Sequence, residues 1–120
     1  RGEPPIVFGD GTQAFDFVSV RDCARANIAA MNADVNDRVY NVCTGHQTSI
    51  AEIAALLIDL TGQDVGIDFH SEETSFVRNR IGDPTRAREE LGFVAEINLV
   101  EGLRDLIRWR GEHQQKAEAE

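Results

Sequence analysis

The apolar residues of this chain fall in short runs that alternate between strand-like and helix-like spacing. Runs rich in β-branched and aromatic residues occupy positions 6–8, 15–20 and 38–42, and positions 65–69 alternate between apolar and small or polar residues. Between these runs, apolar residues recur at intervals of three and four, as on one face of a helix. This alternation predicts an α/β unit. Because its strands are few and short, they cannot form a complete doubly wound sheet.

One helix has a clearly marked start and end. Ser49 and Glu52 form the S-x-x-E pattern of a capping box, in which each side chain bonds a free backbone N–H group. An apolar stripe follows over residues 50–60, and Gly62 fits the left-handed position that ends many helices.

Three further helices are predicted from the same kinds of signal. One is capped by Asp22, carries Ala24, Ile28 and Met31 at helical spacing and ends near Asn32. A short one begins at Asp83–Pro84 and stops at Gly92. The last has Asn98 and Glu101 at its start, and its predicted buried face comprises Leu99, Leu103, Leu106, Ile107 and Trp109.

Two segments lack an apolar pattern. Residues 71–80 are polar and are predicted to form a loop, and residues 112–120 are polar apart from alanine. A terminal segment with no apolar face has little to hold it against a core and frays. The expected organisation is one lobe over residues 1–111 with a frayed tail over residues 112–120.

Composition excludes several classes of function. Twelve basic against 21 acidic side chains give a formal charge of -9, which repels a phosphate backbone and argues against a nucleic-acid partner. No apolar run approaches the roughly 20 residues that cross a bilayer, and the first residues do not form a signal sequence, so no membrane partner and a cytoplasmic location are expected. Cys23 and Cys43 are expected to be free thiols, and with three histidines they offer no ligand spacing for a metal site.

The segment Gly9–Ala14 matches the dinucleotide fingerprint G-x-G-x-x-G/A and follows an apolar run. The fingerprint holds a pyrophosphate only when it opens a helix, and here the strand-like residues 15–20 come next. We therefore interpret it as a turn between strands, and predict no cofactor-binding residue in this chain.

Other reactive side chains also have simpler interpretations. Cys43 could pair with a histidine as a thiol nucleophile, but a core cysteine after a strand is far more common. Asp10 and Asp16 could form a carboxylate pair, but turn and capping roles account for both.

The densest basic stretch of this acidic chain contains Arg78, Arg80, Arg86 and Arg88. A guanidinium group presents a planar set of donors that suits phosphate oxygens. Arg86 and Arg88 stand beside Glu89 and Glu90 on a predicted helix, which favours a solvated surface for them. For Arg78 and Arg80, composition alone leaves phosphate binding and solvation equally open.

Several segments, in one order along nearly the whole chain, together resemble the carboxyl-terminal portion of the extended short-chain dehydrogenases/reductases. The resemblance is to their NAD-dependent nucleotide-sugar epimerases and dehydratases, UDP-glucose 4-epimerases among them. The segments that carry it are Ile6–Gln13, Asp16–Ala26, Val39–Gly45, Thr48–Ala54, Asp83–Arg88, Leu91–Phe93 and Glu101–Leu103.

In that family an amino-terminal Rossmann domain binds NAD and carries a tyrosine–lysine pair that moves a proton. Here the single tyrosine, Tyr40, has no lysine four positions on, and the single lysine is Lys116 in the polar tail. The resemblance therefore implies a substrate-binding carboxyl-terminal lobe that lacks the dinucleotide-binding sheet. It implies no catalytic residue in this chain, no activity of the chain alone, and a missing Rossmann domain as partner.

The resemblance also implies a substrate site. Ile6, Val7 and Phe8 are expected to border the base of a UDP- or dTDP-sugar, and Arg80, with Arg78 in reserve, to bind its diphosphate. Phe15 stands where many relatives have an arginine on the phosphate or sugar, and an apolar ring cannot replace that bond.

Two hypotheses for the intact protein follow from this resemblance. The first is an epimerase or dehydratase, with epimerisation at the sugar C4 favoured over dehydration. The alternative, motivated by Phe15, is a non-catalytic binding or regulatory module. Apolar faces that a missing sheet would cover are expected to make the isolated chain self-associate.

Overall fold

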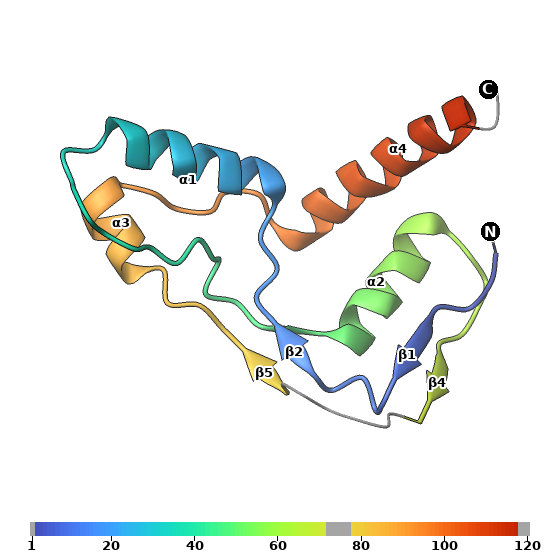
Figure 1. Ribbon diagram of the computed structural model, residues 1–120. Helices are drawn as coiled ribbons and strands as arrows, with labels where there is room; N and C mark the ends of the chain where they lie inside the picture. Colours follow the sequence, from blue (N-terminus) through green and yellow to red (C-terminus); the bar gives the residue numbers. More distant parts are fainter. Residues whose placement is uncertain (1, 72–77, 118–120) are drawn as a thin grey trace.

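A computed structural model describes residues 2–71 and 78–117 of the chain (Figure 1). The elements in chain order are β1 (Ile6–Phe8), β2 (Ala14–Phe15), α1 (Val20–Asn32), β3 (Thr48–Ser49), α2 (Ile50–Thr61), β4 (Asp68–His70), β5 (Asn79–Arg80), α3 (Thr85–Leu91) and α4 (Leu99–Ala117). The α/β class with a few short strands is confirmed.

The strands form two small sheets. β1 pairs with β4 in parallel, and β2 lies between antiparallel β3 and parallel β5. In Figure 1 both sheets lie along the lower edge of the molecule, with α1 and α4 on the opposite side. β5 lies within the stretch predicted as loop, and residues 72–77 of that stretch are outside the described residues.

The helices pack in two groups. α1 packs against α3, where the buried core consists of Ala26, Ala87 and Phe93. α2 packs against β1 and the long helix α4. The chain crosses between the groups through residues 16–19, 33–47, 81–84 and 92–98 (Figure 1). None of the helices in the described residues has the length and apolarity needed to span a bilayer.

The predicted boundaries of α2 are confirmed. The Ser49 Oγ accepts from the Glu52 N–H at 3.2 Å, and the Glu52 carboxylate accepts from the Ser49 N–H at 2.7 Å. Gly62 follows the helix with φ 65°, in the left-handed region. These contacts are local in sequence, which is why the pattern alone predicts them.

The predicted start of α1 is wrong. The N-cap is Ser19, whose Oγ accepts from the Arg21 N–H at 3.3 Å, and Asp22 lies inside the first turn with no exposed surface. The strand predicted over residues 15–20 is shortened to Ala14–Phe15, because the helix begins at Val20. Either serine or aspartate can cap a helix, so the sequence pattern could not choose between them.

The strand predicted over residues 38–42 is absent from the described structure. The segment still alternates as a strand does: Tyr40 and Val42 pack on the core, whereas Val39 is 81% exposed. β-rich sequence needs a partner strand to form a ladder, and within residues 2–71 and 78–117 none lies beside it.

The last two helices match their predicted starts more closely. The Asn98 Oδ1 accepts from the Glu101 N–H at 2.9 Å at the start of α4, and the Asp83 Oδ1 accepts from the Thr85 N–H at 2.9 Å at the start of α3. The Gly92 stop is confirmed, with φ 63°. α3 begins one residue later than predicted, with Pro84 at the N-cap position.

The predicted buried face of α4 is only partly buried. Leu99, Leu103 and Ile107 are half-buried, but Leu106 and Trp109 are 55% and 51% exposed. α4 is described as helical through Ala117, so most of the predicted frayed tail continues a helix. Whether that end frays in solution stays a prediction.

Candidate functional site

Five of the six predicted substrate-binding side chains lie at least partly exposed along the two sheets. β1 carries Ile6 and Phe8, which are 55% and 59% exposed, while Val7 between them is buried at 3%. A strand alternates its side chains between two faces, so Ile6 and Phe8 point outward while Val7 points into the molecule. Val7 therefore offers no side chain to a ligand on the outer face.

Among the described residues, β4 is the only strand that pairs with β1, and the other edge of β1 has no partner strand. The Pro5 carbonyl accepts from the Asp68 N–H at 3.0 Å, and the Gly9 N–H donates to the His70 carbonyl at 2.9 Å. In a parallel ladder alternate residues of a strand face its partner, so the backbone groups of Ile6 and Phe8 point away from β4. On that edge the Gln13 Nε2 donates to the Phe8 carbonyl at 2.8 Å.

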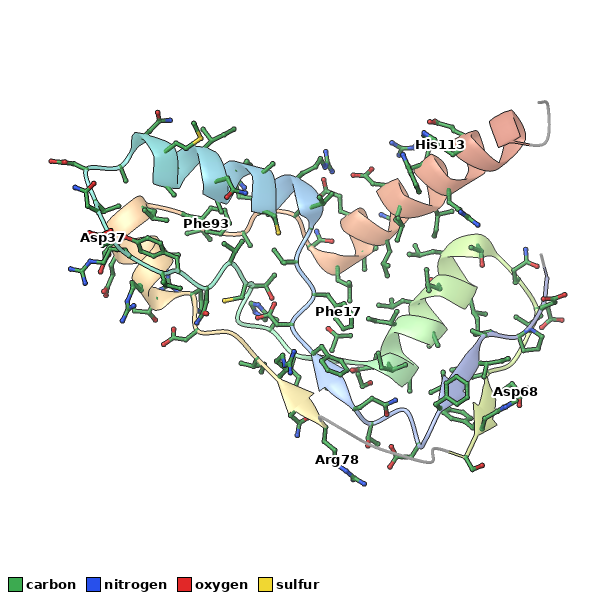
Figure 2. All side chains as sticks on the ribbon, viewed as in Figure 1. Phe17, Asp37, Asp68, Arg78, Phe93 and His113 are labelled. Atoms are coloured by element: carbon green, nitrogen blue, oxygen red, sulfur yellow. The ribbon has the colours of Figure 1, made fainter. Side chains whose placement is uncertain are left out.

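The second sheet brings Phe15, Arg78 and Arg80 together. Phe15 is in register with Arg80, and the Ala14 N–H donates to the Arg78 carbonyl at 2.8 Å. Both arginine side chains are exposed, and Arg78 projects away from the body of the protein (Figure 2). Phe15 is half-buried, with its ring edge-on to Phe17 at 6.2 Å between centroids.

The turn between the sheets is built by Asp10. Its carboxylate accepts from the Thr12 N–H at 2.9 Å and from the Thr12 hydroxyl at 2.6 Å. These bonds, with a smaller contribution from the positive charge of Arg78, lower the pKa of Asp10 below its usual value. The turn role predicted for Asp10 is therefore the one it has, and its carboxylate does not pair with Asp16.

Asp16 is a junction between distant segments. Its carboxylate accepts from the Thr44 N–H at 2.9 Å, the Thr44 hydroxyl at 2.6 Å and the Gly45 N–H at 2.7 Å. Burial by itself raises the pKa of Asp16, but these bonds and one from the Gly82 backbone lower it overall. The Asp16 carboxylate therefore links two segments of the chain. Because its pKa is lowered, it is a weak base and a poor proton acceptor for a substrate.

Cys43 lies beside this junction and is buried. A Cβ placed on Gly82 would lie 2.5 Å from the Cys43 Sγ, so only glycine allows this approach. Burial, and then the negative charge of Asp16, raises the pKa of the Cys43 thiol. A raised pKa disfavours the thiolate, so these surroundings are those of a core thiol and not of a nucleophile.

Asp22 forms a second junction that the sequence analysis did not foresee. Its Oδ2 accepts from the Glu96 N–H at 3.1 Å and the Ile97 N–H at 3.0 Å, and its Oδ1 from Arg25 at 2.5 Å. Burial raises its pKa, and the bonds from Ile97, Glu96 and Arg25 together bring the pKa below its usual value. The partners lie 74 and 75 positions away, so only folding reveals them.

An apolar groove of about 850 Å³ runs between α4 and the segment that leads into α1. It is lined by Phe17 and Val18 on one side and by Leu103, Leu106 and Trp109 on the other. Phe17 points into the space between the two helix groups (Figure 2). Among residues 2–71 and 78–117, no cluster of three or more histidine, cysteine or acidic side chains is arranged to hold a metal ion.

The fold and this site define a class: an α/β lobe whose described residues form two short sheets, with exposed arginines and no complete doubly wound sheet in that part of the chain. The family model for GDP-mannose 4,6 dehydratase matches residues 1–106. The chain therefore belongs to this family of extended short-chain nucleotide-sugar epimerases and dehydratases.

Individual relatives agree with this assignment. The chain is 34% identical over 115 residues to a putative UDP-glucose 4-epimerase of Methanocaldococcus jannaschii, covering 91% of the chain and 35% of the relative. A crystal structure of UDP-glucose 4-epimerase from Thermotoga maritima with UDP-glucose superposes with TM-score 0.88 and 34% identity, over 94% of this chain and 36% of that one. The structure of MoeE5 with UDP-glucuronic acid and NAD superposes with TM-score 0.81 and 36% identity, over 93% and 38%. The chain thus spans about a third of these relatives.

Proposed function

We propose that this chain is the nucleotide-sugar-binding lobe of an NAD-dependent epimerase, with a UDP- or dTDP-sugar as ligand and epimerisation at the sugar C4 as the reaction. The observation that carries the proposal is the pairing of an open, apolar strand edge with two exposed arginines on the adjoining sheet. Relatives whose names or complexes specify UDP-sugars match this lobe over nearly its whole length. The family model describes a dehydratase, so dehydration is the competing reaction.

Different residues of the site would bind the neutral base and the charged diphosphate of the ligand. Ile6 and Phe8 offer apolar side chains, which suit a neutral base, and backbone groups that point away from β4. Of these groups, the Phe8 carbonyl already accepts from Gln13. Arg78 and Arg80 offer guanidinium groups, which suit a diphosphate. Phe15 is in register with Arg80, and its ring would pack on the ligand without bonding a phosphate oxygen.

NAD does not fit the described residues of this lobe. The fingerprint-like segment Gly9–Ala14 joins β1 to β2 and does not open a helix, since the next helix begins only at Val20. The first N–H groups of α2, from Ile50 and Ala51, already donate to the Gln13 and Gly11 carbonyls of this segment. Tyr40 donates its hydroxyl to the Glu90 carboxylate at 2.7 Å, and burial together with Glu90 raises the Tyr40 pKa. We therefore assign NAD and the proton-transfer pair to a separate Rossmann domain.

The surface of the lobe supports such a partner domain. Residues 39–42 alternate like a strand but have no ladder partner in the described structure. On α1, Val20, Ile28 and Met31 are 80%, 59% and 83% exposed. A sheet that paired with residues 39–42 would cover part of this apolar surface. Because both cysteines are free, we also propose a reducing, cytoplasmic compartment.

Calorimetric titration with UDP and UDP-glucose tests the proposed binding. We expect the chain to bind both, and Arg80→Ala to weaken binding about tenfold because one charge-assisted contact is lost. Arg104→Ala, an exposed arginine on α4, is the matched control and should bind like the parent chain. No binding of either ligand would refute the proposal.

The alternative of a non-catalytic module rests on Phe15, which is half-buried against Phe17 at the position where the family resemblance leads us to expect an arginine. A chimera that joins this lobe to the remaining two thirds of the Methanocaldococcus relative separates the two possibilities. Interconversion of UDP-glucose and UDP-galactose by the chimera supports the enzyme. Binding without turnover in a folded chimera supports the module.

A further inference from the structure

The outer face of the β1–β4 pair is an aromatic surface with one acidic side chain. The register places Ile6 opposite Asp68 and Phe8 opposite His70, so these four side chains share one face. The other face carries Val7 and Phe69, whose atoms lie close to Gly11 beside α2. Gly11 also lies close to Ala51 of α2, so the face with Val7 and Phe69 is the one toward α2 and the outer face is turned away from that helix.

His70 is held on this face by two contacts. Its ring stands edge-on to the ring of Phe8, with 6.0 Å between centroids and 78° between planes. Its Nε2 lies 2.9 Å from the Asp68 Oδ2. The two side chains are 46% and 55% exposed, so the pair is a surface feature and is not needed to fill the core. An edge-to-face aromatic pair is favourable beyond the area it buries.

Phe8 makes a ring contact on one side and a backbone hydrogen bond on the other. His70 lies against its ring from the β4 side, and Gln13 bonds its carbonyl on the open edge. Phe8 is therefore fixed in both backbone and ring although it is 59% exposed. A binding residue held in this way loses little conformational freedom when a ligand arrives, which improves affinity.

We propose that His70, oriented by Asp68, is a positioning residue that fixes the Phe8 ring beside the base of the bound nucleotide. This inference rests on the proposed function of the same site. His70 acts through Phe8 and does not touch the diphosphate, because Asp68 beside it would repel a phosphate group. The Asp68–His70 pair therefore affects the affinity for the nucleoside part of the ligand and not for the diphosphate.

The experiment compares UDP with inorganic pyrophosphate as probes, following backbone amide resonances by NMR during titration. We expect His70→Ala to weaken UDP binding about threefold to tenfold and to leave pyrophosphate binding unchanged. His70→Phe should restore UDP affinity to within about twofold, because it keeps an aromatic edge against Phe8. His113→Ala is the matched control, since His113 stacks on Trp109 of α4 instead.

The outcomes separate the two proposals. If the parent chain binds neither probe, the proposed function fails and this inference fails with it. If the parent binds UDP and His70→Ala binds it equally well, only the inference fails. Should His70→Ala unfold, Asp68→Asn replaces it: unchanged UDP affinity in that variant overturns the inference, and a loss specific to UDP supports it.

Discussion

Asp16 and Asp22 show how single carboxylates organise this chain. Each lies near one end of the segment that joins β2 to α1, and each accepts backbone N–H groups from a segment far along the sequence. Asp22 is fully buried and is paired with Arg25. A buried acceptor that satisfies several donors is costly to remove, because the donors are left without partners. These two residues therefore have structural roles, although the sequence also allowed Asp16 to be part of a carboxylate pair and predicted Asp22 as a helix cap.

Their pKa values predict how stability depends on pH. Both carboxyl groups have a lower pKa in the folded protein than in the unfolded chain, so they stabilise the fold above the unfolded value of about 4. That contribution is lost as the pH falls from about 4 through the lower folded values. We expect the free energy of unfolding, measured by urea denaturation, to drop steeply over this range.

Asp16→Asn with Asp22→Asn should make the chain less stable at about pH 7 and should flatten the acid dependence. Asp34→Asn, at an exposed position after α1, serves as the control. Its free energy of unfolding should fall with pH as steeply as that of the parent chain. If the free energy of unfolding of the double variant fell with pH as steeply as that of the parent, the stabilising role of Asp16 and Asp22 would be contradicted.

At the scale of elements, the helix ends are well specified. The capping box of α2 and the left-handed glycines after α2 and α3 follow from residues a few positions apart. Gly92 has φ 63°, and a Cβ there would meet no atom within 4 Å. A substitution at this position therefore tests backbone conformation without a steric clash.

Gly92→Ala should destabilise the chain by about 1 kcal/mol, because alanine is strained in the left-handed region. Gly111→Ala is the matched variant: it lies in the interior of α4, also with open space around it, and should stabilise by about 0.5 kcal/mol. Thermal denaturation followed by circular dichroism measures both changes. Equal effects of the two substitutions would show that the left-handed conformation does not persist in solution.

At the scale of the whole molecule, several large apolar side chains are exposed to solvent. Met31 and Val39 are 83% and 81% exposed, on α1 and on the unpaired segment that follows it. The radius of gyration is 17.4 Å, above the roughly 13–14 Å expected for a compact unit of this length. Such a surface favours association with another chain or with a second copy.

Sedimentation velocity tests this expectation of self-association. We expect the chain to form dimers or larger species at high concentration, and Met31→Lys with Val39→Lys to shift it toward monomer. Asn32→Lys with Asn36→Lys adds the same charge without removing apolar surface, and should associate like the parent chain. A parent chain that stays monomeric at high concentration would contradict the prediction.

Contacts between sequence neighbours, and the identity of the side chains, were sufficient to predict part of the fold. They determined the α/β class, the capped start of α2 and the glycine stops. Phe15 and Arg80 were chosen as site candidates only through the family resemblance, and their role in binding stays a prediction. Folding decided what depends on distant partners: that Asp22 is buried, that residues 38–42 remain without a ladder, and that His70 stands against Phe8. A ladder, a buried carboxylate and an aromatic pair each need a second group whose position only the tertiary structure supplies.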